Sequence, residues 1–183
     1  MRNKIKQIII SFIFCTVLLN VCDITFASEA IFSTTIYSEQ TRNIENIFQH
    51  NLSSFDNIVY SIVPQGLIVS ADRNLFFRNN QVELSNNGKI FLSEFAKIIK
   101  QIPNNFIVEV NSNDTICEKG IENWELTTIQ AEKIEKYFIE ELKVKPNQIR
   151  SIGFGEINPN LHTEESNLLN RVDFVILNYE TIR

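Results

Sequence analysis

The stretch LSNNGKIFLSEFAKIIKQIPNNFIVEV, residues 84–110, predicts a helix followed by a strand. Apolar residues recur at three- and four-residue spacing over residues 91–102, which is typical of a helix with one buried face. Ser85 is a suitable N-cap for this helix, and Pro103 ends it. Residues 106–110 then carry Phe, Val and Val at every second position, which indicates a half-buried strand.

Similar patterns lie on both sides of this stretch. Residues 66–69 predict a turn and a short strand, and residues 123–142 predict a second helix with Asn123 as its N-cap. Residues 149–154 and 172–176 predict two further strands. Strands joined through helices lie parallel or are separated by another strand, and right-handed crossovers place both helices on one face. The order predicts an α+β fold, a two-layer β-α-β-α-β-β sandwich with both helices on one face of the sheet.

The first 27 residues predict a secretory signal peptide. A basic start precedes an almost unbroken apolar run over residues 8–21, and small residues follow at a suitable cleavage site. One alternative is a retained membrane anchor, because such a run approaches the length that spans a bilayer. Another is a lipoprotein signal with lipidation at Cys22, although Val21 and Asp23 are unusual neighbours for a lipidated cysteine.

Residues 28–56 predict a polar linker with a short amphipathic helix, which is either a spacer or a docking surface for a partner. Residues 57–179 form the predicted domain. Residues 28–183 contain 14 Lys and Arg and 21 Asp and Glu, and this acidic balance argues against nucleic acid as a partner. Cys117 is the only cysteine that remains after cleavage of the signal peptide, so it cannot form an internal disulfide. The hydrophobic core must therefore stabilise the fold.

The residue pattern gives no support for catalysis or for a cofactor. His50 and His162 lie in polar segments, and a nucleophile pair of Cys117 with His162 requires two distant loops to meet. Gly153 and Gly155 lack the third glycine and the following helix that a nucleotide-binding loop needs. Metal-ligand spacing is absent as well. We therefore expect a protein that is not an enzyme and holds no cofactor and no metal.

Five short motifs follow the order and spacing of the OmpA-like family, and the chain resembles that family from Pro64 to Leu177. The motifs are Pro64-Gln65-Gly66-Leu67 with Phe76, Leu84-Ser85 with Gly88 and Leu92, Asn123-Trp124-Glu125-Leu126-Thr127 with Ala131, Gly153-Phe154-Gly155-Glu156 with Pro159, and Asn170-Arg171-Val172-Asp173. The family includes outer-membrane porin tails, peptidoglycan-associated lipoproteins and flagellar-stator B subunits. The resemblance implies a cell-envelope protein in the periplasm, with or without outer-membrane association, whose partner is peptidoglycan.

The resemblance also implies a ligand: the stem peptide of peptidoglycan, with a diamino acid that bears an ammonium and a carboxylate. In the family, a loop Asp pairs with the ammonium and a helix Arg holds the carboxylate in bidentate geometry. Here an ungapped alignment places Thr115 at the Asp position, whereas a one-residue gap places Asp114 there. Gln130 stands at the position of the helix Arg, and Arg171 matches one of two adjacent family arginines. The candidate peptidoglycan-binding residues are Asp114, Thr115, Asn123, Gln130 and Arg171.

Three functions follow from these positions. The first is peptidoglycan association, weakened or altered because Gln130 brings no charge. The second is a structural role in an envelope-spanning machine, such as a secretion system, with the OmpA-like fold used mainly for contacts with other envelope proteins. The third is a flagellar-stator type of anchor. Stator subunits need a transmembrane helix that carries a functional acid, and the apolar run has no acidic residue within it, which weakens this alternative.

Overall fold

The computed structural model describes residues 39–78, 81–112, 122–155 and 170–179. Contacts divide the chain into two units, Met1–Gln40 and Thr41–Arg183, and the second unit contains the domain. The predicted signal peptide with Cys22 lies outside the described residues, and so do Asp114 and Thr115. These assignments therefore stay predictions.

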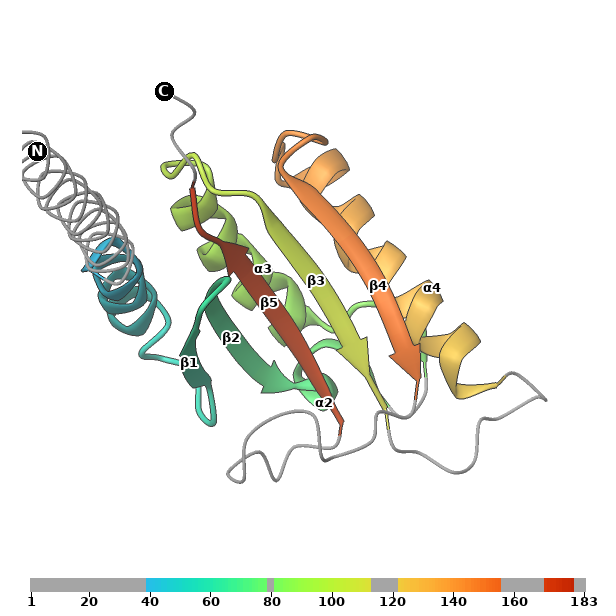
Figure 1. Cartoon of the computed structure of the whole chain (residues 1–183). Coiled ribbons are helices and arrows are strands. Elements are labelled where there is room, and N and C mark those ends of the chain that lie inside the picture. The colour runs from blue at the N-terminus through green and yellow to red at the C-terminus, as the bar shows by residue number, and fades with distance from the viewer. Residues whose placement is uncertain (1–38, 79–80, 113–121, 156–169, 180–183) are drawn as a thin grey trace, which may run out of the picture. The chain divides into compact units, whose positions relative to one another are not determined.

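The domain is built on one five-stranded sheet (Figure 1). The strands are β1 (Val59–Val63), β2 (Gly66–Asp72), β3 (Phe106–Asn111), β4 (Ile149–Gly155) and β5 (Arg171–Leu177). Their order across the sheet is β1-β2-β5-β3-β4, and only the β3–β4 pair is parallel. β5 therefore lies between β2 and β3 and pairs with both in the antiparallel sense. As expected for strands joined through a helix, β2 and β3 run parallel with another strand between them.

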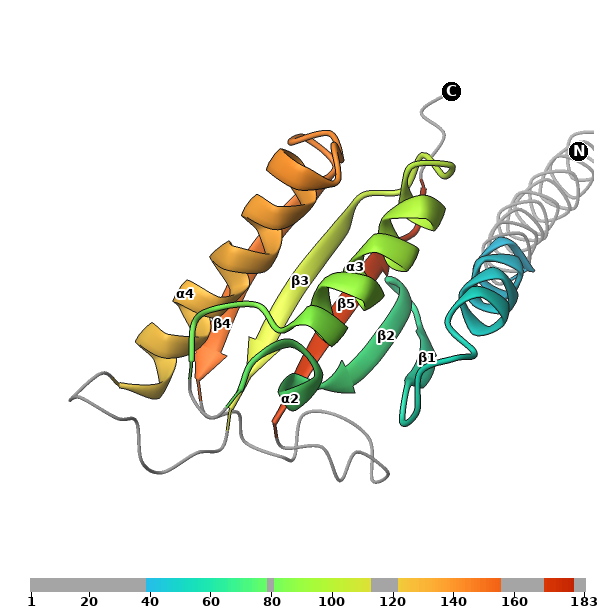
Figure 2. The same cartoon turned by 180° about the vertical axis from the view of Figure 1, so that it is seen from behind.

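Two long helices, α3 (Asn86–Ile99) and α4 (Asn123–Lys136), lie on the same face of this sheet (Figure 2). A short helix, α2 (Arg73–Phe76), directly follows β2, and α4 continues into the π-helical turn η2 (Tyr137–Glu141). Ser85 caps α3 as predicted, because its side chain accepts a hydrogen bond from the Gly88 amide at 2.9 Å. The predicted two-layer α+β architecture is confirmed.

Phenylalanine rings fill the space between the helices and the sheet. Phe174 on the central strand β5 lies 4.5 Å from Phe95 of α3 and 6.3 Å from Phe138 of η2, measured between ring centroids. Phe106 of β3 lies 5.3 Å from Phe138 in an edge-to-face arrangement. The helices and strands therefore meet through large apolar side chains, which the three- and four-residue spacing on α3 predicts.

The N-terminal side of the domain contributes a strand and core side chains that the sequence does not predict. β1 is an additional strand that pairs with β2 through a tight turn, with Val63 opposite Gly66. Residues 41–51 are helical, and the fully buried Phe48 lies 4.7 Å from the Phe95 ring. Leu52 is buried beside it. Two side chains of the predicted linker therefore belong to the core, while the domain boundary at residue 57 stays a prediction.

Candidate ligand-binding site

One edge of the sheet collects the elements that carry the predicted site residues. Because β2, β3 and β4 run parallel to one another, their C-terminal ends lie at the same edge, where β5 begins (the lower end of the sheet in Figure 1). The register places Arg171, the first residue of β5, between Asp72 of β2 and Asn111 of β3. Short polar connections at the ends of parallel strands are a common setting for ligand contacts.

Two glycines bring the first turns of α4 onto the end of β4. A Cβ atom added to Gly153 would lie 2.1 Å from the Thr128 backbone nitrogen, so only glycine permits this approach. Gly155 has a φ of +62°, and its amide donates to Thr127 Oγ1 at 2.9 Å. Gly153 therefore permits the close approach of α4, and Gly155 supplies the positive φ at the end of β4.

Asn123 does not cap α4, so this expectation from the sequence is wrong. The helix begins at Asn123 itself, and the preceding Glu122 makes no side-chain capping bond. The Asn123 Oδ1 atom instead accepts a hydrogen bond from Ser112 Oγ at 3.3 Å. Asn123 therefore ties the start of α4 to the residue that follows β3, and the first turn of the helix carries the favourable acid Glu125.

Gln130, at the position of the family's helix arginine, is fully buried. Its Oε1 atom accepts a hydrogen bond from Arg73 Nη1 at 3.3 Å, and its Nε2 atom donates to the Gln81 carbonyl at 2.8 Å. Both ends of the amide are therefore held. Gln130 links α4 to α2 and to the segment that follows α2.

Arg73 contacts the predicted site residue Gln130, although the sequence does not predict this contact. It is the first residue of α2, is only 3% exposed, and its backbone amide donates to the Asn170 carbonyl at 3.1 Å. Its one sequence signal is an arginine placed directly after the apolar strand β2. That signal says nothing about Gln130, because 57 positions separate the two residues.

Arg171 lies on the sheet face opposite the helices, since its neighbour Val172 points into the core. Its Nε atom donates to Asp173 Oδ2 at 2.6 Å, and Asn111 Nδ2 donates to the same oxygen at 3.0 Å. All three side chains are buried. The Asn111 Oδ1 and Asp173 Oδ1 atoms are also buried, and within the described residues they accept no hydrogen bond. Arg171 therefore braces the start of β5.

Glu109 of β3 is directly opposite Asp173 on this face. Burial raises the pKa of the Glu109 carboxyl above its ordinary value, and the nearby negative charge of Asp173 raises it further. The Arg171 guanidinium acts in the opposite direction with a smaller effect on this pKa. Glu109 is therefore protonated more readily in the folded protein than in water.

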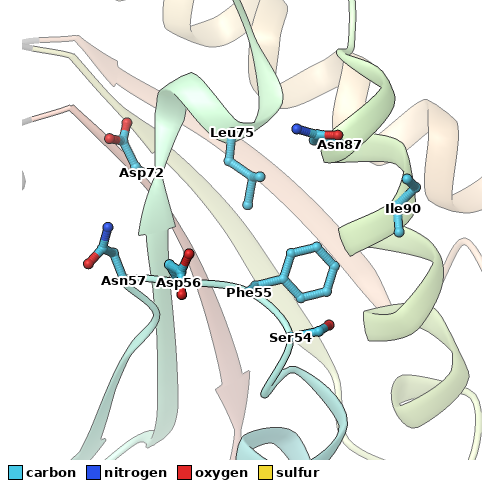
Figure 3. A pocket seen from close by; sticks show the side chains of 8 residues that line it. All are labelled: Ser54, Phe55, Asp56, Asn57, Asp72, Leu75, Asn87 and Ile90. Atoms are coloured by element: carbon cyan, nitrogen blue, oxygen red, sulfur yellow. The ribbon is translucent and has the colours of Figure 1, made fainter.

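The described residues line two grooves, and the first of them reaches this sheet edge at Asp72. The first, of about 370 Å³, has Asp56, Asn57 and Asp72 along one side and Asn87 and Ile90 of α3 along the other, with Ser54, Phe55 and Leu75 between them (Figure 3). The second, of about 460 Å³, is lined by Glu83, Leu84, Lys89, Lys133, Lys136, Tyr137, Glu140 and Glu141. Neither groove is lined by a residue that the sequence singled out as a binding residue.

The arrangement at the sheet edge is suited to hydrogen bonding and charge pairing. Within the described ranges, no three His, Cys, Asp or Glu side chains come together as metal ligands. A search of the same ranges for a helix long and apolar enough to cross a membrane finds none. The described side chains at this edge provide hydrogen-bond donors and acceptors and one buried ion pair.

Comparisons with known proteins agree with this fold. The profile of the OmpA family matches residues 76–170, about half of the chain. The periplasmic domain of Helicobacter pylori MotB is 25% identical with a TM-score of 0.59, and the match covers 68% of this chain and 82% of that one. A putative MotB-like protein from Desulfovibrio vulgaris is 18% identical with a TM-score of 0.69, over 82% of this chain and 98% of that one.

Two further relatives extend the comparison. The cell wall anchor of the T6SS from Pseudomonas aeruginosa is 10% identical with a TM-score of 0.58, over 74% of this chain and 97% of that one, and shows likeness of fold alone. The uncharacterized protein YtxE of Bacillus subtilis is 23% identical over 125 residues, which cover 64% of this chain. The match spans only 50% of that curated relative. Because the family profile, the sheet order and the helix placement agree, the chain belongs to the OmpA family.

Proposed function

We propose that this protein is a non-enzymatic component of the cell envelope that associates with the stem peptide of peptidoglycan through its OmpA-like domain. The proposal places it in the periplasm, where it is either free or associated with the outer membrane. It rests on the family and on the chemistry of the sheet edge.

The single observation that carries the proposal is a chain of contacts around that edge. Gln130 accepts a hydrogen bond from Arg73, whose amide donates to the Asn170 carbonyl. Arg171 lies opposite Asn111 in the register of β5 and β3. Ser112, which follows Asn111, donates a hydrogen bond to the Asn123 side chain. Three residues at positions that the resemblance assigns to the ligand thus lie at one edge of the sheet, with the Arg171 side chain on the face opposite the helices.

The same contacts support weak binding. The Asn123, Gln130 and Arg171 side chains already hold partners inside the protein. A ligand that competes with such partners gains only the difference between old and new hydrogen bonds. The loss of a charge-assisted bidentate contact at position 130 costs on the order of 1–3 kcal/mol, or roughly 5- to 150-fold in affinity.

Co-sedimentation of the purified protein with sacculi tests the proposal. We expect partial pelleting that falls several-fold in Asp114→Ala, because a carboxylate that pairs with the ligand ammonium is lost. Thr115→Ala separates the two alignments, and Asp56→Ala, an exposed acid in the Ser54–Asn57 segment, is the matched control. Absence of pelleting by the wild-type protein contradicts wall association. Tight pelleting that disappears in Asp114→Ala contradicts only the weakened site.

A structural role in an envelope-spanning machine is the second candidate. The observation in its favour is the row of exposed apolar side chains on the helix-free face of the sheet, where Ile152 and Phe154 of β4 are each 41% exposed. Exposed apolar side chains that share one face suit a contact with another protein. Co-purification of envelope proteins, reduced by Phe154→Ser and not by Asp114→Ala, would favour this second candidate.

A further inference from the structure

We propose that the first groove, between residues 54–57 and α3, binds a lysine side chain from a basic segment of a partner protein (Figure 3). This inference goes beyond peptidoglycan association and does not rest on it. The groove is lined by none of the residues at which the resemblance places the peptidoglycan ligand, and its occupant belongs to a different chemical class.

The first step is the charge of the groove. Among the eight described residues that line it, Asp56 and Asp72 are acidic and none is basic. Residues 28–183 contain 21 acidic and 14 basic side chains, so this part of the chain attracts a basic partner. A peptidoglycan stem peptide carries carboxylates beside its ammonium, and the two aspartates repel those carboxylates. A basic protein segment, which brings only positive charge, therefore suits this groove better.

The second step is the availability of polar atoms. Within the residues that the structure describes, the Asp56, Asn57 and Asn87 side chains form no hydrogen bond or ion pair with the protein. Asp72 Oδ1 accepts from the Asn74 amide at 2.8 Å, which fixes this carboxylate at the start of α2. A ligand therefore displaces no internal partner of the three open side chains. Because the acceptors come from separate segments, they suit a compact ammonium better than the planar fork of a guanidinium.

The third step is the apolar wall. Leu75 and the Phe55 ring lie between the acidic side and α3, where Ile90 is 55% exposed (Figure 3). Lysine packs its four-carbon stem on apolar surface and keeps its ammonium among polar groups. The groove volume of about 370 Å³ lies within the range of sites that hold small ligands. The stem and the ammonium of one lysine therefore match the two sides of the groove.

The fourth step is the rigidity of the walls. The Phe55 ring lies 5.1 Å from the core ring of Phe91 in an edge-to-face arrangement. Ser85 Oγ donates to the Leu75 carbonyl at 2.5 Å, which holds α2 against the start of α3. Because these contacts exist without a ligand, binding requires little ordering of the protein.

The test titrates the isotope-labelled protein with two capped tripeptides, Ala-Lys-Ala and Ala-norleucine-Ala, and follows the backbone amides by NMR. Norleucine has the stem of lysine without the ammonium. The wild-type protein should bind the lysine peptide roughly three- to tenfold more tightly, as expected for two solvent-exposed ion pairs. The shifts should be largest in residues 54–57 and at the start of α3. The preference should shrink at about 0.5 M NaCl, because salt screens exposed charges.

Asp56→Asn with Asp72→Asn removes both charges and should abolish the preference, while asparagine at position 72 keeps the cap of α2. The matched control, Glu125→Gln with Glu132→Gln, removes two exposed charges outside the groove and should keep it. The amide spectra show whether each variant is folded.

Three outcomes overturn the inference: no binding or equal binding of both peptides by the wild-type protein, shifts confined to residues outside the groove, or an unchanged preference in the folded Asp56→Asn, Asp72→Asn variant. Tighter binding in this groove of a stem tripeptide that ends in lysine also overturns it, because the occupant is then the wall. Pelleting with sacculi is a separate measurement, so the proposed function and this inference can fail independently.

Discussion

Charged and polar side chains at the sheet edge join the ends of β3 and β5. Arg171 and Asn111 both donate to Asp173 Oδ2, so one carboxylate oxygen holds the ends of β3 and β5 together. Glu109 lies beside this group and carries a second negative charge. Burial and the nearby charge of Asp173 both raise the pKa of the Glu109 carboxyl.

This shift predicts a pH dependence of stability. Because the native state raises the pKa of Glu109 above 4.5, the folded protein binds a proton that the unfolded chain has already released. Glu109 therefore lowers the free energy of unfolding progressively as pH rises from about 4.5 through the raised native pKa. Glu109→Gln should remove this decline and be more stable than wild type at pH 7, measured by urea unfolding from pH 4 to pH 8. An unchanged decline in the variant would contradict the assignment to Glu109.

A positive charge lies close to Gln130, although Gln130 itself is neutral. Position 130 holds a neutral side chain, yet a guanidinium lies 3.3 Å from it. Judged by aligned positions alone, the site has lost its arginine. The contacts show that a guanidinium from α2 lies beside position 130.

At the scale of elements, the contact of α4 with β4 depends on two glycines. Gly153 faces the backbone of Thr127 and Thr128, with no room for a side chain. The alternation of β4 places Ile152 and Phe154 on the other face of the sheet. Glycine on the helix-facing side of β4 therefore allows α4 to approach the sheet backbone closely.

Gly153→Ala should lower the free energy of unfolding by at least ~2 kcal/mol, because its Cβ would lie 2.1 Å from the Thr128 nitrogen and α4 must move. Equilibrium urea unfolding measures the effect. Ser93→Ala, an exposed change on α3, is the control and should stay within ~0.5 kcal/mol of wild type. Equal stability of Gly153→Ala and wild type would show that α4 does not pack as closely as described.

The whole molecule draws part of its core from outside the predicted domain. Phe48 and Leu52 are buried against α3, and the side chain of Thr41 donates to Asn178 Oδ1 at 3.0 Å near the end of the domain. Residues 41–52 thus contribute to the stability of the domain. The sequence allows a spacer or a docking surface there, and neither alternative anticipates a core contribution.

Phe48→Ala should destabilise the protein by roughly 3–5 kcal/mol, the usual cost of truncating a fully buried Phe. The matched control is Ile47→Ala, because Ile47 is the neighbouring residue and is 44% exposed. The difference between the two variants is measured by thermal and urea unfolding of the purified protein. If both variants lose the same small amount, the helical residues 41–51 do not pack on the domain.

The sequence by itself determined the local elements and the family. Periodicity predicts α3, β3 and the start of β4, because side-chain spacing along one segment reports which face is buried. The short edge strand β1 was not predicted, because its five partly exposed residues show little periodicity in the sequence. Only the tertiary structure decided the order β1-β2-β5-β3-β4, the core role of Phe48 and the meeting of Arg73 with Gln130. Each of these joins residues far apart along the chain, and such contacts depend on how the elements pack, which no local pattern records.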